Sequence, residues 1–261
     1  MTTVLSADGT ELIARRCGNG IPVVLVHGSL GGLDSWDGVA ALLADTYEVW
    51  VYARRGYAPS GAGRSSKTFA DDVADLLAIT QAAGGDAHLV GASYGATVGL
   101  HAALDHPSTF RSLAVFEPPL FASGSALHPV LRSYESLLAS GDLATAARLF
   151  AEKVARAPAA LLDSLGPDGG DAAEAVGCLH DLQAMAADET DVGRWRAIAI
   201  PTLLMRGAQS WAPIPATMER LANALPTAGR VVLERQSHFA THTAPEMFAA
   251  KLRMFWSGHS A

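Results

Sequence analysis

The residues best suited to chemistry lie in the stretch Gly91-Ala92-Ser93-Tyr94-Gly95. An apolar, strand-like run precedes this stretch, and a run with helical spacing follows it. A serine with small neighbours between a strand and a helix matches a nucleophile elbow, a sharp turn that exposes the serine hydroxyl. An ordinary glycine-rich turn is the simpler alternative. The context favours chemistry, and we predict that Ser93 is a nucleophile.

A serine hydroxyl needs a base to take its proton. Of the nine histidines, His238 follows the last predicted strand and precedes the final predicted helix, which places it at the same sheet edge as Ser93. His242 is the rival candidate, and the four-residue spacing of this pair also resembles a zinc site. No glutamate follows the first histidine, and no third ligand is evident, so we expect no metal.

An acyl-transfer reaction also needs backbone N–H groups that stabilise an oxyanion. The loop that begins with His27-Gly28 follows a short apolar run typical of a buried strand. We expect the N–H of Ser29 in this loop and the N–H of Tyr94 to be the two oxyanion-hole donors. His27 itself is interpreted as a residue that orders the loop.

The elements that must position these residues follow a regular order. Strand and helix signals alternate up to Pro118, which predicts a mostly parallel sheet covered by helices on both faces. Helical signals alone follow, with a glycine-rich loop at residues 166–171, before strand signals return. We therefore predict an α/β core formed by residues 1–117 and 198–261, and a helical cap, or lid, inserted at residues 118–197.

Charge and composition exclude several classes of function. The net charge is −7 and the basic residues are dispersed, so we expect neither nucleic acid nor membrane partners. From its N-terminal residues we expect no signal peptide, and no apolar run is long enough to predict a membrane span. Cys17 and Cys178 lie far apart, which favours reduced thiols and a cytoplasmic protein. The sequence leaves the oligomeric state open.

Taken together, these motifs resemble the α/β-hydrolase superfamily, in its cap-bearing branch with esterases, lactonases and haloalkane dehalogenases. HGSLGG matches the oxyanion loop, RRGYAPSG the loop after the fourth strand, GASYG the elbow, IPTLLMRG the penultimate strand and SHFATHTAPE the histidine loop. The resemblance covers nearly the whole chain and implies an α/β-hydrolase fold with an inserted helical cap. Ala53 departs from the pattern, because an acid often precedes the arginine pair.

A second departure concerns the acid that orients the catalytic histidine. In most relatives this acid follows the penultimate strand, where this chain has Ser210. One subgroup of haloalkane dehalogenases instead uses a glutamate after the strand that follows the nucleophile helix, and Glu117 stands there in this chain. The resemblance therefore implies a triad of Ser93, His238 and Glu117. The alternatives are a Glu117 that simply reaches solvent, a Ser-His dyad and an inactive site.

The nucleophile narrows the predicted reaction. Dehalogenases and epoxide hydrolases of this fold attack with a carboxylate, so Ser93 favours acyl transfer. We predict a cofactor-free serine hydrolase that cleaves a small, mostly apolar carboxylic ester or lactone through an acyl-enzyme. Leu30, Phe121 and Trp211 are expected to line the substrate pocket. Two alternatives stay open: a non-hydrolytic enzyme of the same fold, either a lyase or a cofactor-free oxygenase with His238 as base, and a non-catalytic small-molecule binding protein.

Overall fold

A single sheet forms the centre of the computed structural model, which describes residues 1–163 and 172–258. In that part of the chain the sheet has 8 strands in the order β1-β2-β4-β3-β5-β6-β7-β8. Strand β2 is antiparallel to β1 and β4, and all pairs from β4 to β8 are parallel. The strands are β1 (Thr2–Leu5), β2 (Glu11–Cys17), β3 (Ile21–Val26), β4 (Tyr47–Tyr52), β5 (Ala87–Ala92), β6 (Phe110–Phe116), β7 (Thr202–Gly207) and β8 (Gly229–Leu233).

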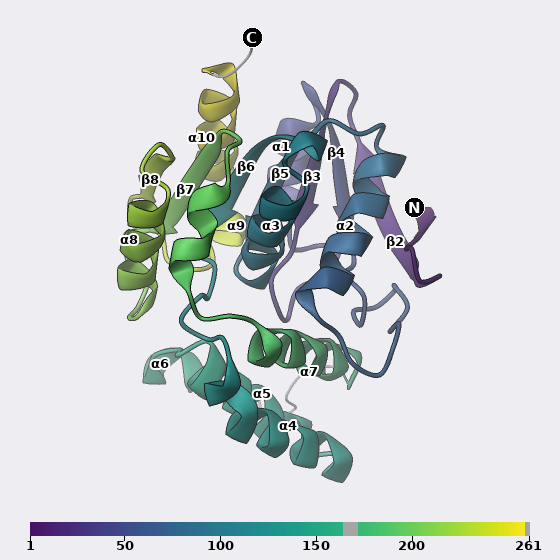
Figure 1. The fold of residues 1–261 in the computed structure, drawn as a ribbon, viewed down its shortest axis with the longest axis vertical. Coiled ribbons are helices and arrows are strands. Elements are labelled where there is room, and N and C mark those ends of the chain that lie inside the picture. Colours follow the sequence, from purple (N-terminus) through teal and green to yellow (C-terminus); the bar gives the residue numbers. More distant parts are fainter. Residues whose placement is uncertain (164–171, 259–261) are drawn as a thin grey trace.

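Helices cover both faces of this sheet (Figure 1). Strand β3 shows why: Val24 and Val26 belong to one hydrophobic cluster, while Val23 and Leu25 belong to the other. Side chains alternate between the faces of a strand, so a strand that is apolar throughout needs cover on both. The first cluster contains residues of α2 (Phe69–Ala82), α3 (Tyr94–Asp105) and α8 (Ile214–Ala224), and the second contains residues of α1 (Asp37–Leu43) and α10 (Pro245–Ser257).

Between β6 and β7 the described residues form helices and no strand. Figure 1 shows α4, α5, α6 and α7 grouped at one end of the α/β layers, and we call this group the cap helices. The loop expected at residues 166–171 lies outside the described residues. The helices of this segment are η2 (Ser125–Leu127), α4 (His128–Ser140), α5 (Leu143–Leu149), the π-helix η3 (Phe150–Val154), α6 (Ala159–Leu162), α7 (Ala172–Ala187) and η4 (Val192–Ala197).

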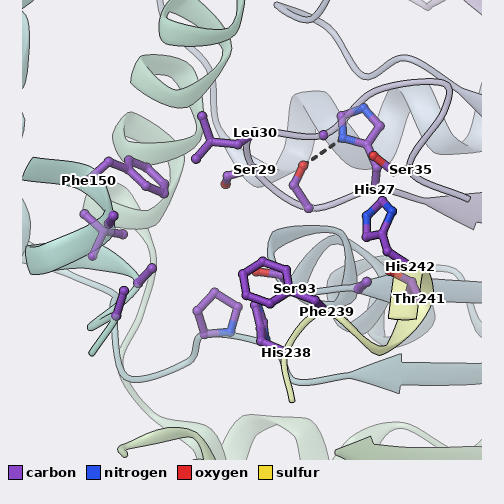
Figure 2. A pocket seen from close by; sticks show the side chains of 18 of the residues that line it. His27, Ser29, Leu30, Ser35, Ser93, Phe150, His238, Phe239, Thr241 and His242 are labelled. Atoms are coloured by element: carbon purple, nitrogen blue, oxygen red, sulfur yellow. Dashed lines mark hydrogen bonds between the residues drawn. The ribbon is translucent and has the colours of Figure 1, made fainter. Parts of the chain in front are cut away.

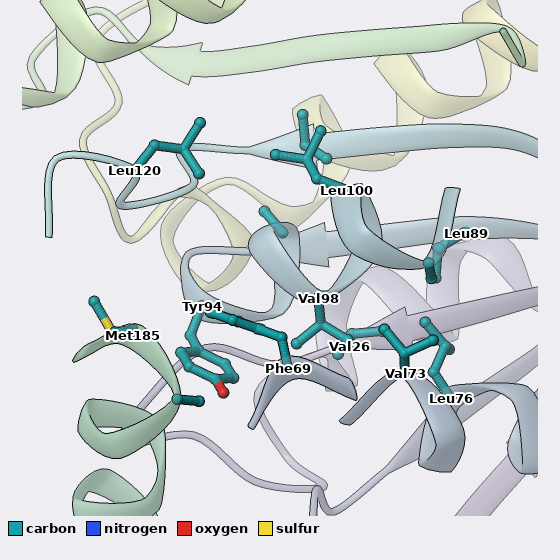
Figure 3. Packing of buried hydrophobic residues seen from close by; sticks show 14 of the residues in the cluster. Val26, Phe69, Val73, Leu76, Leu89, Tyr94, Val98, Leu100, Leu120 and Met185 are labelled. Atoms are coloured by element: carbon teal, nitrogen blue, oxygen red, sulfur yellow. The ribbon is translucent and has the colours of Figure 1, made fainter. Parts of the chain in front are cut away.

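The cap helices are joined to the core by continuous apolar packing. Met185 of α7 belongs to the same buried cluster as Phe69 and Tyr94 of the core (Figure 3). The 3₁₀ helix η4, which ends the segment, packs against α8 and α3. This packing fixes α7 against the core. None of the helices in the described part of the chain combines the length and the apolar character that a bilayer-spanning helix needs.

Candidate active site

Ser93 occupies a strained turn between β5 and α3. Its backbone has φ 53° and ψ −122°, a conformation that residues with a side chain rarely adopt. Only glycine fits beside it, because a Cβ on Gly91 would lie 2.2 Å from the carbonyl oxygen of Gly95, and a Cβ on Gly95 would lie 2.3 Å from that of Val26. The predicted elbow is therefore present, and Ser93 lines a cavity at this turn (Figure 2).

His238 lines the same cavity (Figure 2), and Glu117 holds its ring. The distance from His238 Nδ1 to Glu117 Oε2 is 2.6 Å. The ring of His238 also packs against Phe116 and Trp211, with centroid distances of 6.1 and 5.5 Å. A carboxylate that accepts from Nδ1 fixes the tautomer in which Nε2 can take a proton. The expected rival, His242, is exposed, and it is His238 that bonds the glutamate.

Glu117 is buried, with 1% of its surface exposed, so the alternative in which it reaches solvent is wrong. Its second oxygen, Oε1, accepts from the backbone N–H of Gly207 at 2.7 Å and from Ser210 Oγ at 2.6 Å. These donors hold the carboxylate group while Oε2 faces His238. Ser210 therefore supports the acid, although serine itself has no charge to offer.

The loop after β3 approaches the nucleophile closely. A Cβ on Gly28 would lie 2.9 Å from Ser93 Cβ, so glycine is needed here, and the next residue, Ser29, lines the cavity. Tyr94 is the first residue of α3, and the N–H groups of a first helical turn have no partner within the helix. Ser29 thus lines the same cavity as Ser93, and Tyr94 follows Ser93 directly; these are the two residues expected to supply the N–H donors.

His27 is buried and orders this loop, as the sequence predicted. Its Nε2 accepts from the backbone N–H of Arg54 at 3.0 Å, and its Nδ1 lies 2.7 Å from the carbonyl oxygen of Gly28, to which it donates. Burial, together with the nearby Arg54 cation, lowers the pKa of His27 to about 3. A neutral imidazole with both nitrogens engaged has no capacity left for proton transfer, so its role is structural.

The cavity has a volume of about 270 Å³ and a mostly apolar wall. Leu30 and Trp211 line it, as expected. Among the described residues that line it, none is Asp, Glu, Lys or Arg. Several apolar side chains come from the segment between β6 and β7: Pro119, Phe150, Ala151, Val154, Ala155, Ala157, Leu161 and Met185.

Phe121, the third residue expected in the pocket wall, does not line this cavity. Its side chain packs against the larger hydrophobic cluster. The chain turns at this point, with the N–H of Ala122 donating to the carbonyl oxygen of Pro119 at 2.8 Å. Pro119, at the start of this turn, lines the cavity, whereas Phe121 is not among the residues that line it.

A group of buried charges beside the oxyanion loop was not predicted from the sequence: Arg54, Lys67, Asp72 and Asp181, which we call the buried ion cluster. The sequence does hold a signal for one member of the cluster, Asp181. Asp181 shares the apolar face of α7 with Cys178, Leu182 and Met185, at the spacing of one helical stripe. A carboxylate on an apolar stripe needs a partner, because an unpaired buried charge is costly.

A strained serine, an imidazole held by a buried carboxylate and adjacent backbone N–H groups suit one kind of chemistry. The imidazole can take the hydroxyl proton, the carboxylate can stabilise the resulting imidazolium, and N–H groups can bind an oxyanion. Acyl transfer is the reaction that this arrangement fits best.

Comparison with known proteins identifies the family that shares this architecture. The family model described as alpha/beta hydrolase fold matches residues 21–245. The crystal structure of an alpha/beta hydrolase from Sphaerobacter thermophilus DSM 20745 is 34% identical with a TM-score of 0.82, covering 98% of this chain and 100% of that chain. An esterase from Thermogutta terrifontis has a TM-score of 0.83 and covers 100% of this chain and 99% of its own, but at 22% identity it shows the fold alone.

A curated relative, the fluoroacetate dehalogenase of Burkholderia sp, is 37% identical over 109 residues, which are 38% of this chain and 35% of the relative. The chain spans less than half the length of the first curated relatives that it matches.

Proposed function

The chain belongs to the alpha/beta hydrolase family, and from this premise we propose that it is a serine hydrolase that cleaves a small, neutral, mostly apolar carboxylic ester or lactone. One observation carries the proposal. His238 Nδ1 lies 2.6 Å from the buried Glu117 Oε2, and the ring lines the same cavity as the strained Ser93. This is the arrangement that activates a hydroxyl for attack on a carbonyl.

In the proposed reaction Ser93 Oγ attacks the ester carbonyl while His238 Nε2 takes its proton. Glu117 stabilises the imidazolium that forms, and the N–H groups of Ser29 and Tyr94 bind the oxyanion. The intermediate collapses to an acyl-enzyme, and His238 returns the proton to the leaving alcohol. A water molecule, deprotonated by His238, then attacks the acyl carbonyl and releases the acid from Ser93.

The serine nucleophile favours an acyl substrate over an alkyl halide. Attack of Ser93 on a carbon–halogen bond would leave an alkyl ether on the enzyme. An ether has no carbonyl for a His238-activated water to attack, so the enzyme would not turn over. An acyl ester on Ser93 has that carbonyl, and hydrolysis regenerates the hydroxyl.

The cavity favours a neutral substrate. Its volume of about 270 Å³ suits a small molecule, and apolar side chains form most of its described wall. A charged substrate group would lose its hydration there without a counter-ion among the described lining residues, which costs several kcal/mol. The substrate class is therefore a small uncharged ester or lactone.

Hydrolysis of p-nitrophenyl acetate and butyrate tests the proposal. Ser93→Ala should abolish turnover, and Ser136→Ala, an exposed serine of α4, should leave it unchanged. A fluorophosphonate should label Ser93 in the wild-type protein, as mass spectrometry can show. Activity that persists in Ser93→Ala, with Ser93 unlabelled, would instead support a lyase or a cofactor-free oxygenase that uses His238 as base.

A further inference from the structure

The buried ion cluster contacts the side chain of each residue proposed to bind the oxyanion. Ser29 Oγ donates to Asp181 Oδ2 at 2.7 Å. The hydroxyl of Tyr94 donates to Asp72 Oδ2 at 2.6 Å. The two N–H groups therefore belong to residues whose side chains are tied to the two carboxylates of one cluster.

Arg54 joins these carboxylates to the backbone of the oxyanion loop. Its Nη1 and Nη2 bond the two oxygens of Asp181 at 2.7 and 2.8 Å. Its Nε donates to the carbonyl oxygen of His27 at 3.0 Å, and Nη2 also donates to that of Gly28 at 3.2 Å. The guanidinium lies 4.4 Å from the centroid of the Tyr94 ring. One planar, rigid group thus contacts both sides of the proposed oxyanion hole.

The positive and negative charges of the cluster balance, and both carboxylates accept from several donors. Lys67 Nζ lies 2.6 Å from Asp181 Oδ1 and 3.1 Å from Asp72 Oδ2, so two cations face two carboxylates. The hydroxyl of Tyr57 adds a donor to Asp181 at 2.7 Å. Burial alone would raise the pKa of Asp181, but Arg54 and Lys67 hold it below its usual value, so the carboxylate stays ionised. Removal of one partner would leave a buried charge uncompensated.

Asp181 differs from the other members because it comes from the cap helices. It lies on α7, while Arg54 and Lys67 come from the core segment between β4 and α2, and Asp72 lies in the first turn of α2. Asp181 is fully buried and accepts from four different core residues. These bonds exist only while α7 lies against the core.

We propose that the buried ion cluster positions the oxyanion hole, and that Asp181 makes this positioning depend on the docking of α7. The inference rests on the proposed function, which assigns the two N–H donors. Oxyanion donors act only at short range, and small displacements cost much of their effect. A cap that moved away would release Ser29 and leave Arg54 and Lys67 facing the single carboxylate of Asp72. Covering the cavity and completing the oxyanion hole are therefore one event. Asp181 is in this view a positioning residue.

Two hydroxyl deletions test the positioning directly. Ser29→Ala and Tyr94→Phe keep the backbone N–H and remove only its anchor. Each should lower kcat for p-nitrophenyl butyrate about 10-fold, with KM changed less than about 2-fold, because the lost contact acts on the oxyanion and leaves the apolar wall intact. In an Asp181→Asn background, Ser29→Ala should add less than about 2-fold, since the shared contact is already lost.

Asp75→Asn is the matched control for Asp181→Asn. Asp75 is 1% exposed and holds Arg55 through two bonds of 2.7 and 2.6 Å. Among the described residues, no hydrogen bond or ion pair joins Asp75 or Arg55 to Ser29 or Tyr94. Both variants should lower the melting temperature. Only Asp181→Asn should lower kcat and speed amide hydrogen exchange in a peptide that covers residues 27–33. If Asp181→Asn does not fold, the same exchange experiment on Ser29→Ala replaces it.

The outcomes separate the two proposals. Wild-type kcat in both Ser29→Ala and Tyr94→Phe would overturn the inference, and so would unchanged exchange of the loop in Asp181→Asn. Failure to find ester hydrolysis that depends on Ser93 would overturn the proposed function. In that case hydrogen exchange alone decides whether the cluster orders the loop.

Discussion

The hydroxyl of Ser210 donates a hydrogen bond to Glu117 Oε1 at 2.6 Å. The residue at the position where an acid was expected therefore supports the glutamate that follows β6. Strands β6 and β7 are neighbours in the sheet, and the loops after them leave the same edge. Glu117, which follows β6, bonds His238, and Ser210, on the loop after β7, bonds the same carboxylate. In this chain Glu117, directly after β6, supplies the charge. The N–H of Gly207 at the end of β7 and the hydroxyl of Ser210 in the following loop hold it.

Glu117→Gln should lower kcat for a p-nitrophenyl ester by on the order of 10³- to 10⁴-fold, as loss of a triad acid does, because an amide neither fixes the tautomer of His238 nor stabilises its cation. Ser210→Ala should cost only about 10-fold, since it removes one hydrogen bond to a carboxylate that keeps the Gly207 N–H. Steady-state kinetics on both variants checks this order. The reverse order would show that Glu117 is not the acid.

An aspartate at position 210, on the loop after β7, should partly replace the carboxylate of Glu117. Ser210→Asp in the wild-type protein should lower activity, because two carboxylates would face each other across the site of the present 2.6 Å bond. The same substitution in Glu117→Gln removes that repulsion and returns a charge to the edge behind His238. We expect the double variant to exceed Glu117→Gln by about 10-fold or more in kcat. Equal kcat values for Glu117→Gln and the double variant would contradict the idea that either loop can supply the acid.

Gly95→Ala should prevent stable folding. The added Cβ would lie 2.3 Å from the backbone oxygen of Val26, and neither backbone can move without breaking the packing of α3 on the sheet. Gly61→Ala is the control, because its Cβ would meet its first neighbour at an ordinary 3.5 Å. Thermal unfolding should show a small change for Gly61→Ala and a large loss, or no soluble protein, for Gly95→Ala. Similar melting temperatures would refute the steric account of the elbow.

Stability should fall as the solution becomes acidic. Burial, assisted by the Arg111 cation, lowers the pKa of His88 from its ordinary 6.5 to about 4. Between these values the unfolded chain binds a proton that the folded chain rejects, so the free energy of unfolding decreases as the pH falls from 6.5 to 4. His27, whose pKa is lowered to about 3, acts in the same direction.

The variant His88→Gln isolates this contribution, because glutamine can still bond Ser112, the present partner of His88 at 2.7 Å, but does not titrate. Urea unfolding at several pH values should give a shallower decrease for His88→Gln than for the wild-type protein. Parallel decreases would mean that His88 is not the source.

Substrate length should depend on Ala151. This residue lies in η3, is 8% exposed and lines the cavity, so Ala151→Phe reduces the space of about 270 Å³. We expect kcat/KM for p-nitrophenyl octanoate to fall about 10-fold more than kcat/KM for the acetate. Ala139→Phe on the exposed side of α4 is the control and should change neither ratio. An equal loss for both esters would place the acyl chain elsewhere.

The sequence by itself determined the fold and the edge of the sheet at which the chemistry gathers. Apolar runs fixed the buried strands, and the glycines around Ser93 marked the strained turn, because these signals act on the local backbone. The position of His238 and Glu117 at strand ends followed from the alternation of elements. Carboxyl ends of parallel strands share one edge, so strand order was enough to bring these residues together.

Only the tertiary structure decided how side chains from distant segments pair. Ser210 and Glu117 are 93 positions apart, and Ser29 and Asp181 are 152 apart. Phe121 packs against the larger hydrophobic cluster and does not line the cavity, a difference that apolar character alone does not predict. Periodicity describes which face of an element is apolar, whereas the partner of a buried charge depends on which other elements fold against that face.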